Sequence, residues 1–359
     1  MSVESQVPIQ ALPQGVLPGM ISLVFGHPDA STLPVEDLCT AAETVLQSQQ
    51  ARLALAYGAE PGTPVLIEYL VNKLNREERL DLTRDNLMIT AGSTSAVDMI
   101  ARLYAGRDGV VLVEAPTCHD ALHVFRDHSA DLRGVPVDGE GMIVEDDVYR
   151  DLVFEGNVPP SFYALANGRG VLRIGSFSKI LSPGLRVGWL MAETKHIERC
   201  VNCGVMQMGG GASPFAAHVV AEYCQAGRLE PHIVELRRVY HQRCAVTLQA
   251  LEYHMPAGVT WTRPRGGFFV WLTLPDGLEI GLLRETARAQ GMLFVPGTGF
   301  FANGGGERNL RLAFSFVPPD EIERGVTILA QAIRDLIGNA RKTEAKLGVL
   351  AVRQEKGLL

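Results

Sequence analysis

Groups that could hold and use a phosphorylated aldehyde stand close together near the middle of the chain. Ser176-Phe177-Ser178-Lys179 offers two hydroxyls and one amine, and Arg186 follows seven residues after the lysine. A lysine amine forms an imine with an aldehyde, while hydroxyl and guanidinium groups hold a phosphate. This combination suits pyridoxal 5′-phosphate (PLP). The alternative is a surface lysine in a polar turn, which an isolated motif of this kind more often is.

A second candidate for phosphate binding lies earlier in the chain. The strand-like residues 86–90 run into Ala91-Gly92 and a helix that we expect to begin at Ser93. Unpaired amides and the positive end of the helix dipole favour an anion at such a position, and small residues let it approach. The alternative is simple capping of the helix by Ser93 or Thr94.

Several motifs resemble, in the same order, those of the fold-type I PLP-dependent aminotransferases of class I/II. Besides the lysine segment they are Leu55-Ala56-Tyr57-Gly58 and residues 90–96, 144–152, 266–271 and 309–312. The nearest subgroup resembles the 2-aminoadipate and broad-specificity aminotransferases, which are related to the catalytic half of MocR-type regulators. The resemblance covers most of the chain.

The resemblance implies how the cofactor would be held. Lys179 would carry it, and the positions that match the family's phosphate contacts are Ser93, Thr94, Ser176, Ser178 and Arg186.

Two further positions concern the partner subunit and the cofactor ring. Tyr57 matches a tyrosine that reaches the phosphate from the neighbouring subunit, which implies a homodimer with shared active sites; alternatively it is a loop aromatic that packs under the N-terminal arm. Cys118 stands where the family usually has an aromatic residue stacked on the ring, and we expect a loss of about 0.5–1.5 kcal/mol of stacking unless His119 substitutes.

An acid that keeps the pyridine nitrogen protonated makes the ring a better sink for electrons. Asp146, which follows the strand-like Ile143-Val144-Glu145, is predicted to be that acid. Tyr149 lies at the Asp-x-x-Tyr spacing and matches a tyrosine that donates to the ring's phenolic oxygen. Asp147 is the alternative acid, and two acidic residues that cap a strand end at the surface are the alternative to both.

Arg311 is the candidate for binding the substrate carboxylate. A guanidinium holds a carboxylate through two parallel hydrogen bonds, and in the apolar stretch Leu310-Arg311-Leu312 a charge is costly without a partner or ligand. An internal salt bridge is the alternative. Gly26 matches an arm glycine that lets the backbone pass near the substrate, and the adjacent His27 is interpreted as a loop residue.

A departure from the family falls just before Ile143. Where the family has a helix, a strand that ends in an Asn-Pro-Thr-Gly-like turn, and another helix, residues 135–142 run straight into the next strand. A strand with its crossover needs about 30 residues, so one such unit is missing, together with an asparagine that bonds the phenolic oxygen. Asp138-Gly139-Glu140-Gly141 is typical of a hairpin turn, which would make the next strand antiparallel and move Asp146 to the wrong edge. Either the sheet rearranges, or the chain is a damaged or spliced relative.

Composition narrows the class of protein. The chain has 359 residues, 47% of them hydrophobic, and a net charge of −7 without a basic run, which disfavours nucleic acid or an anionic membrane as a partner. Cys200 and Cys203 have metal or redox spacing, but no second pair follows, so we expect free thiols and no metal site. No signal peptide or long apolar run appears, which predicts a cytoplasmic protein.

The alternation of helical and strand-like patterns predicts an α/β fold. The expected parts are an arm over residues 1–34, a large PLP-binding domain with a mainly parallel sheet over 35–230, a small α+β domain over 231–340, and a polar tail over 341–359. The arm is too short for a winged-helix domain, which disfavours a MocR-type regulator.

The expected activity is transfer of an amino group between an L-amino acid and a 2-oxo acid, with 2-oxoglutarate as the acceptor by family analogy. The alternatives are another PLP reaction, such as that of a lyase, decarboxylase or racemase, because the cofactor site does not fix which bond breaks, or a non-catalytic relative that binds a ligand or partner.

Overall fold

The computed structural model describes residues 19–105, 109–134 and 142–356, with side chains described as far as residue 338. Its longer helices are α1 (Val35–Gln47), α3 (Pro64–Glu78), α4 (Ser93–Ile100), α5 (His119–Asp127), α7 (Thr194–Val201), α9 (Pro214–Gln225), α10 (Leu229–His254), α11 (Ile280–Ala289) and α12 (Pro319–Lys356). Short helices are α2 (Ala51–Ala54), α6 (Phe162–Leu165) and α8 (Gly204–Gln207).

The sheet that carries the lysine segment has the strand order β2-β7-β6-β5. Its strands are β2 (Leu87–Thr90), β5 (Ile143–Asp146), β6 (Val171–Ser176) and β7 (Gly188–Met191). β5 is parallel to β6, whereas β7 is antiparallel to both of its neighbours. All six residues of β6 are buried, as is typical of a strand covered on both faces.

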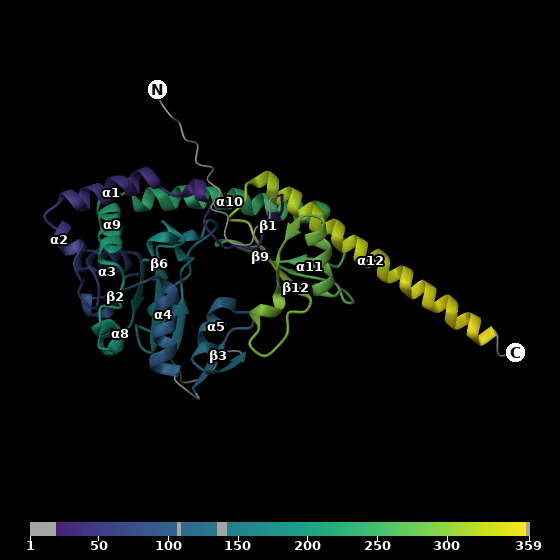
Figure 1. Cartoon of the computed structure of the whole chain (residues 1–359), viewed down its shortest axis with the longest axis horizontal. Helices are drawn as coiled ribbons and strands as arrows, with labels where there is room; N and C mark the ends of the chain where they lie inside the picture. The colour runs from purple at the N-terminus through teal and green to yellow at the C-terminus, as the bar shows by residue number, and fades with distance from the viewer. Residues whose placement is uncertain (1–18, 106–108, 135–141, 357–359) are drawn as a thin grey trace, which may run out of the picture.

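A second, two-stranded sheet pairs β3 (Val110–Val113) with β4 (Asp131–Gly134) in parallel, and α5 connects the two strands (Figure 1). The hairpin reading of the junction is therefore wrong for the strands themselves: β4 pairs with β3 and β5 pairs with β6, both in parallel. The physical reason is that each strand satisfies its backbone groups on a parallel neighbour from elsewhere in the chain. The turn 138–141 lies outside the described residues.

The predicted mainly parallel sheet is thus divided into a four-stranded and a two-stranded part, with no ladder between β3 and β5 in the described residues. A common apolar core still joins the two parts. Met88, Leu132 and Ile174 from the two sheets lie in one cluster with Leu122 of α5 and Val97 of α4. Helix α4 therefore takes over part of the positioning that a shared ladder would give.

The C-terminal part is built on the antiparallel sheet β11-β12-β9-β8. Its strands are β8 (Thr260–Trp261), β9 (Phe269–Thr273), β11 (Val295–Pro296) and β12 (Asn309–Ala313). β1 (Ile21–Ser22) pairs with β10 (Met292–Leu293), so the N-terminal segment is attached to this part.

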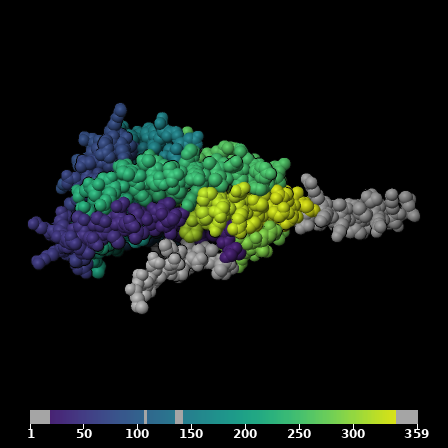
Figure 2. Space-filling model, turned by 90° about the horizontal axis from the view of Figure 1, so that it is seen from above, coloured from purple at the N-terminus to yellow at the C-terminus, as the bar shows by residue number. Residues whose placement is uncertain are grey.

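Figure 2 shows α1, α10 and α12 along one face of the molecule. Helix α12 continues to Lys356, so the segment expected as a polar tail extends this helix away from the body (Figure 1). In the described part of the chain, no helix combines the length and apolar character needed to cross a membrane.

A buried charge cluster fixes the turn after β5. Arg173 of β6 has a side chain only 1% exposed, and its guanidinium pairs with Asp147 at 2.8 Å and with Glu78 at the end of α3. Arg150 also pairs with Glu78, at 3.1 Å. The cluster ties α3, β6 and the β5 turn together.

We predict that Arg173→Met lowers the free energy of unfolding by about 3 kcal/mol, because it leaves buried carboxylates with less compensation. Urea denaturation measures this change. The control is Arg84→Met, whose partner Glu68 is 55% exposed, and it should cost less than about 1 kcal/mol. Equal effects of the two substitutions would show that the cluster is not a stability determinant.

Candidate active site

The parallel register of β5 and β6 sets which side chains share one edge of the sheet. Asp146, the last residue of β5, pairs with Ile174 of β6, and β6 ends two residues later at Ser176. Lys179 follows in the turn after β6. The carboxyl ends of both strands therefore deliver an acid, a hydroxyl and an amine to the same edge.

The amine of Lys179 lies among a carbonyl and two aromatic rings. Its Nζ donates to the carbonyl oxygen of Gly26 at 2.8 Å and is 5.8 Å from the ring centre of Tyr149 and 5.9 Å from that of Phe268. Gly26 has no room for a side chain, because a Cβ there would clash with the ring of Phe269. The structure thus brings Lys179, Tyr149 and Gly26 together, as their motifs predicted.

Burial and neighbouring charges have opposing effects on the pKa values of these groups. Burial lowers the pKa of Lys179, although the nearby carboxylate of Asp146 works in the opposite direction. A lowered pKa makes the neutral, nucleophilic amine more accessible. Burial raises the pKa of Tyr149, so its phenol stays a hydrogen-bond donor at neutral pH.

The two candidate acids face different surroundings. Asp147 points into the charge cluster with Arg173 and Arg150, and burial outweighs these arginines and raises its pKa to about 6. Asp146 interacts electrostatically with Lys179. Asp146 is exposed as a residue, yet partial desolvation of its carboxyl group raises the pKa. A hydrogen bond from the Val148 amide and the charge of Lys179 oppose that rise. Asp146, not Asp147, is therefore the acid on the lysine side.

The candidate phosphate groups meet around β7. Ser176 of β6 and Thr90 of β2 both pair with Gly188, which places the turn after β2 beside the Ser176-Phe177-Ser178 segment. The hydroxyl of Ser176 donates to that of Ser178 at 2.9 Å, and both residues are buried. Ser93 and Thr94 open helix α4 directly after this turn.

The guanidinium of Arg186 lies beside the turn that precedes α4. Its Nη2 donates to the carbonyl oxygen of Ala91 at 3.3 Å. Gly92 has a φ of +84°, and a Cβ at this residue would lie 2.6 Å from Nη2 of Arg186. The missing side chain of Gly92 therefore leaves room for a guanidinium at the N-terminus of α4, where an anion is favoured. Two hydroxyls, a guanidinium and helix-end amides suit a phosphate.

Arg311 of β12 lies between aromatic rings. Its Cζ is 4.1 Å from the ring centre of Phe269 and 5.0 Å from that of Phe300, and Nη2 donates to the carbonyl oxygen of Val24 at 2.9 Å. Its buried Nε has no partner in the described part of the chain, and burial lowers the guanidinium pKa. A buried cation with a donor to spare suits a carboxylate ligand, and no salt bridge of Arg311 is present in the described residues.

The remaining predicted residues differ in their surroundings. Cys118 occupies the N-cap position of α5 without a side-chain capping bond, and it is exposed. Tyr57 is 91% exposed, and its ring lies against Gly209, so this chain does not itself bring Tyr57 to the lysine. His27 is exposed, in agreement with a loop residue.

Sequence reasoning assigned no role to Phe269 or Phe300. Phe269 stood within a quoted motif, but its stacking on Arg311 depends on how β9 and β12 pair. Phe300 ends the 3₁₀ turn η6 (Gly297–Phe300), where no sequence signal marked it.

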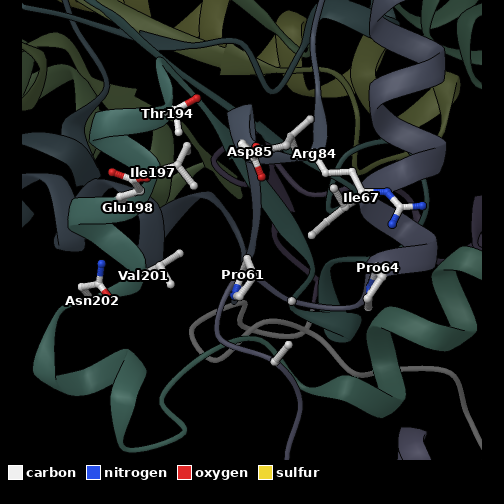
Figure 3. A pocket seen from close by; sticks show the side chains of 13 residues that line it. Pro61, Pro64, Ile67, Arg84, Asp85, Thr194, Ile197, Glu198, Val201 and Asn202 are labelled. Carbon is white, nitrogen blue, oxygen red and sulfur yellow. The ribbon is translucent and has the colours of Figure 1, made fainter.

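A separate pocket of about 420 Å³ lies between α3, the 3₁₀ turn η2 (Arg84–Asn86) and α7 (Figure 3). Thr194, Ile197 and Glu198 of α7 line one side of it, and Pro64 and Ile67 of α3 line the other. None of the groups around Lys179 lines this pocket, so it is not part of the site described above.

Comparison with known proteins agrees with this geometry. The family model for aminotransferase class I and II matches residues 137–329. An aromatic-amino-acid aminotransferase 1 from Thermococcus litoralis is 30% identical, over 88% of this chain and 88% of the relative. That alignment spans 370 positions, more than the 359 residues of this chain, so the relative contains residues with no counterpart here.

Two solved structures are similar over nearly the whole fold. The multiple substrate aminotransferase from Thermococcus profundus has a TM-score of 0.84 with 28% identity, covering 90% of this chain and 93% of that one. The α-aminoadipate aminotransferase LysN from Thermus thermophilus, solved with N-(5′-phosphopyridoxyl)-L-leucine, has a TM-score of 0.80 with 28% identity, covering 90% and 94%. This chain belongs to aminotransferase class I and II, and is a PLP-dependent enzyme that transfers an amino group between an amino acid and a 2-oxo acid.

Proposed function

We propose that the site around Lys179 acts on an L-amino acid whose α-carboxylate binds Arg311, with 2-oxoglutarate as the expected acceptor. The observation that carries this proposal is the buried, unpartnered Nε of Arg311. A guanidinium offers a planar fork to a carboxylate, and a ligand there would compensate the buried charge.

PLP, when bound, supplies an electron sink that stabilises negative charge on the substrate's α-carbon. Its phosphate would be held by Ser176, Ser178, Arg186 and the opening of α4 at Ser93 and Thr94. Gly92 supports this assignment, because its missing Cβ keeps the place beside Arg186 open.

Three side chains would perform the remaining tasks. Lys179 would attach the cofactor and then move a proton from the substrate's α-carbon, and its lowered pKa favours both tasks. Asp146 would face the pyridine nitrogen and keep it protonated. Tyr149 would donate to the phenolic oxygen, because burial keeps its proton in place.

We also propose that the enzyme is a homodimer in which Tyr57 reaches the partner's phosphate site. The ring of Tyr57 lies against Gly209, and the large apolar residues that flank these two positions in the sequence, Leu53, Leu55, Val205 and Met208, are exposed. Patches of this kind commonly mark interfaces. A monomer in sedimentation equilibrium would contradict the shared site.

The proposed setting is the cytoplasm, and nucleic acid is not a proposed partner. All six cysteines are free, which fits a reducing compartment. The net charge of −7 disfavours a polyanionic partner.

We predict that borohydride reduction of the PLP-loaded protein fixes the cofactor on the peptide that contains Lys179, as peptide mass analysis would show. The PLP-loaded protein should then be incubated with a panel of amino acids that includes aromatic amino acids and 2-aminoadipate. With its substrate it should release one equivalent of the corresponding 2-oxo acid. The variant Lys179→Ala should form none. Release of carbon dioxide or loss of optical purity without a 2-oxo acid would point to the decarboxylase or racemase alternative, and an inert, PLP-bound protein would point to a non-catalytic relative.

For Arg311→Lys we predict a KM for the amino acid at least tenfold higher, because one of two charge-assisted hydrogen bonds, worth about 1.5–3 kcal/mol, is lost. The dissociation constant of PLP should stay within about twofold, since Arg311 is assigned to the substrate. The matched control is Arg308→Lys, whose guanidinium contacts Asp276 and the Leu274 carbonyl. Equal losses of substrate and PLP affinity would mean that Arg311 is structural.

A further inference from the structure

Two histidines at the N-terminal end of α5 bring their Nε2 atoms close together. His119 and His123 are four residues apart, so they lie on the same side of the helix. Their Nε2 atoms are 3.3 Å apart, and the ring centres are 4.6 Å apart at an interplanar angle of 60°. The only role considered for either residue above is stacking of His119 on the cofactor ring, and it does not involve His123.

The distance between the two nitrogens fits a shared metal ion. Histidine nitrogens bind Zn²⁺ at about 2.0–2.1 Å, so two of them at a tetrahedral angle lie about 3.3–3.4 Å apart. The observed separation of 3.3 Å matches this value. The pair therefore already has the spacing that a tetrahedral ion requires.

The surroundings of His119 also hold its ring in place. Its Nδ1 lies 3.3 Å from a carboxylate oxygen of Asp120, on the ring's other nitrogen. A carboxylate there fixes the tautomer that leaves Nε2 free for a metal, as occurs around zinc-bound histidines. On its other side the ring packs against Gly299, where a Cβ would clash with it, and lies 5.9 Å from the ring of Phe300.

We propose that His119 and His123 form a binding site for a divalent transition metal ion, with Zn²⁺ preferred by the tetrahedral spacing. In the described part of the chain no group of three or more histidine, cysteine or acidic side chains could hold a metal, so the protein supplies two ligands here. Water would complete the coordination, since the side chain of His119 is 41% exposed. Imidazole ligands suit Zn²⁺ and Cu²⁺ better than Mg²⁺ or Ca²⁺.

The position of the pair gives the ion a structural consequence. His119 contacts η6 through Gly299 and Phe300, and the Thr117 amide donates to the Phe300 carbonyl oxygen at 2.9 Å. The ring of Phe300 in turn lies 5.0 Å from the guanidinium carbon of Arg311. A bound ion holds the His119 ring in place at the point where α5 meets the turn beside the proposed carboxylate site.

The test is calorimetric titration of the PLP-loaded protein with Zn²⁺, in a buffer that does not chelate metals and with the thiols kept reduced. We expect His119→Ala and His123→Ala each to bind Zn²⁺ at least tenfold more weakly than the unchanged protein. We also expect Zn²⁺ to raise the melting temperature of the unchanged protein but not of these variants, because a ligand that binds only the folded state stabilises it. Mg²⁺ at the same concentration should do neither.

His128→Ala is the matched control, because His128 follows the same helix but is paired with Asp98 at 2.8 Å. It should bind Zn²⁺ as the unchanged protein does. The proposal is overturned if both His119→Ala and His123→Ala keep their Zn²⁺ affinity within about twofold, or if His128→Ala loses as much. It is also overturned if Cys118→Ser abolishes binding while the histidine variants retain it, because the ligand would then be a thiolate. The readouts are metal affinity and melting temperature, so these outcomes do not depend on the activity assay.

Discussion

The parallel pairing of β5 with β6 is the constraint on which the rest of this site depends. Because the strands run the same way and Asp146 is opposite Ile174, the acid and the Ser176–Lys179 segment leave the sheet at one edge. An antiparallel β5 would place Asp146 at the opposite edge, away from the lysine. The roles proposed for Asp146 and Tyr149 presuppose this direction, since both residues follow β5 directly. The chain keeps it although a strand-plus-crossover unit of the family has no counterpart before Ile143.

Side-chain interactions replace the positioning that a continuous sheet would give. In the described residues β5 has a ladder only with β6, and β3 has one only with β4. The Arg173 cluster fixes the turn after β5, because the Arg173 guanidinium joins Asp147 to Glu78 of α3. Helix α4 packs against the four-stranded sheet and against α5, and it lies in the apolar cluster that both sheets share. A buried ion cluster is costly to desolvate. What it contributes here is a fixed geometry of the turn after β5.

The part of the site proposed to bind the substrate depends on a different interaction, the burial of Arg311. Its charge is taken out of water between Phe269 and Phe300, and only part of its hydrogen-bonding capacity is used by the chain itself. The aromatic faces offset part of the desolvation cost, and a carboxylate ligand would offset more. The residues proposed for cofactor attachment and for substrate binding thus belong to different parts of the fold, which meet where Gly26 contacts both Lys179 and Phe269.

The sequence by itself determined the class of fold and nominated the residues of the chemistry. Lys179, Arg186 and Arg311 were nominated because their types and local motifs are what PLP and carboxylate binding require, and these are short-range properties. Three matters depended on long-range pairing. The direction of β5 was decided by its parallel ladder with β6, whereas the local turn residues favoured a hairpin and an antiparallel strand. The pairing of Asp147 with Arg173, which lies 26 residues further along the chain, appears only in the folded protein, and it leaves Asp146 as the acid proposed to face the cofactor. The contact of Phe300 with Arg311 forms only when the C-terminal sheet assembles, and no motif around Phe300 in the sequence predicts it.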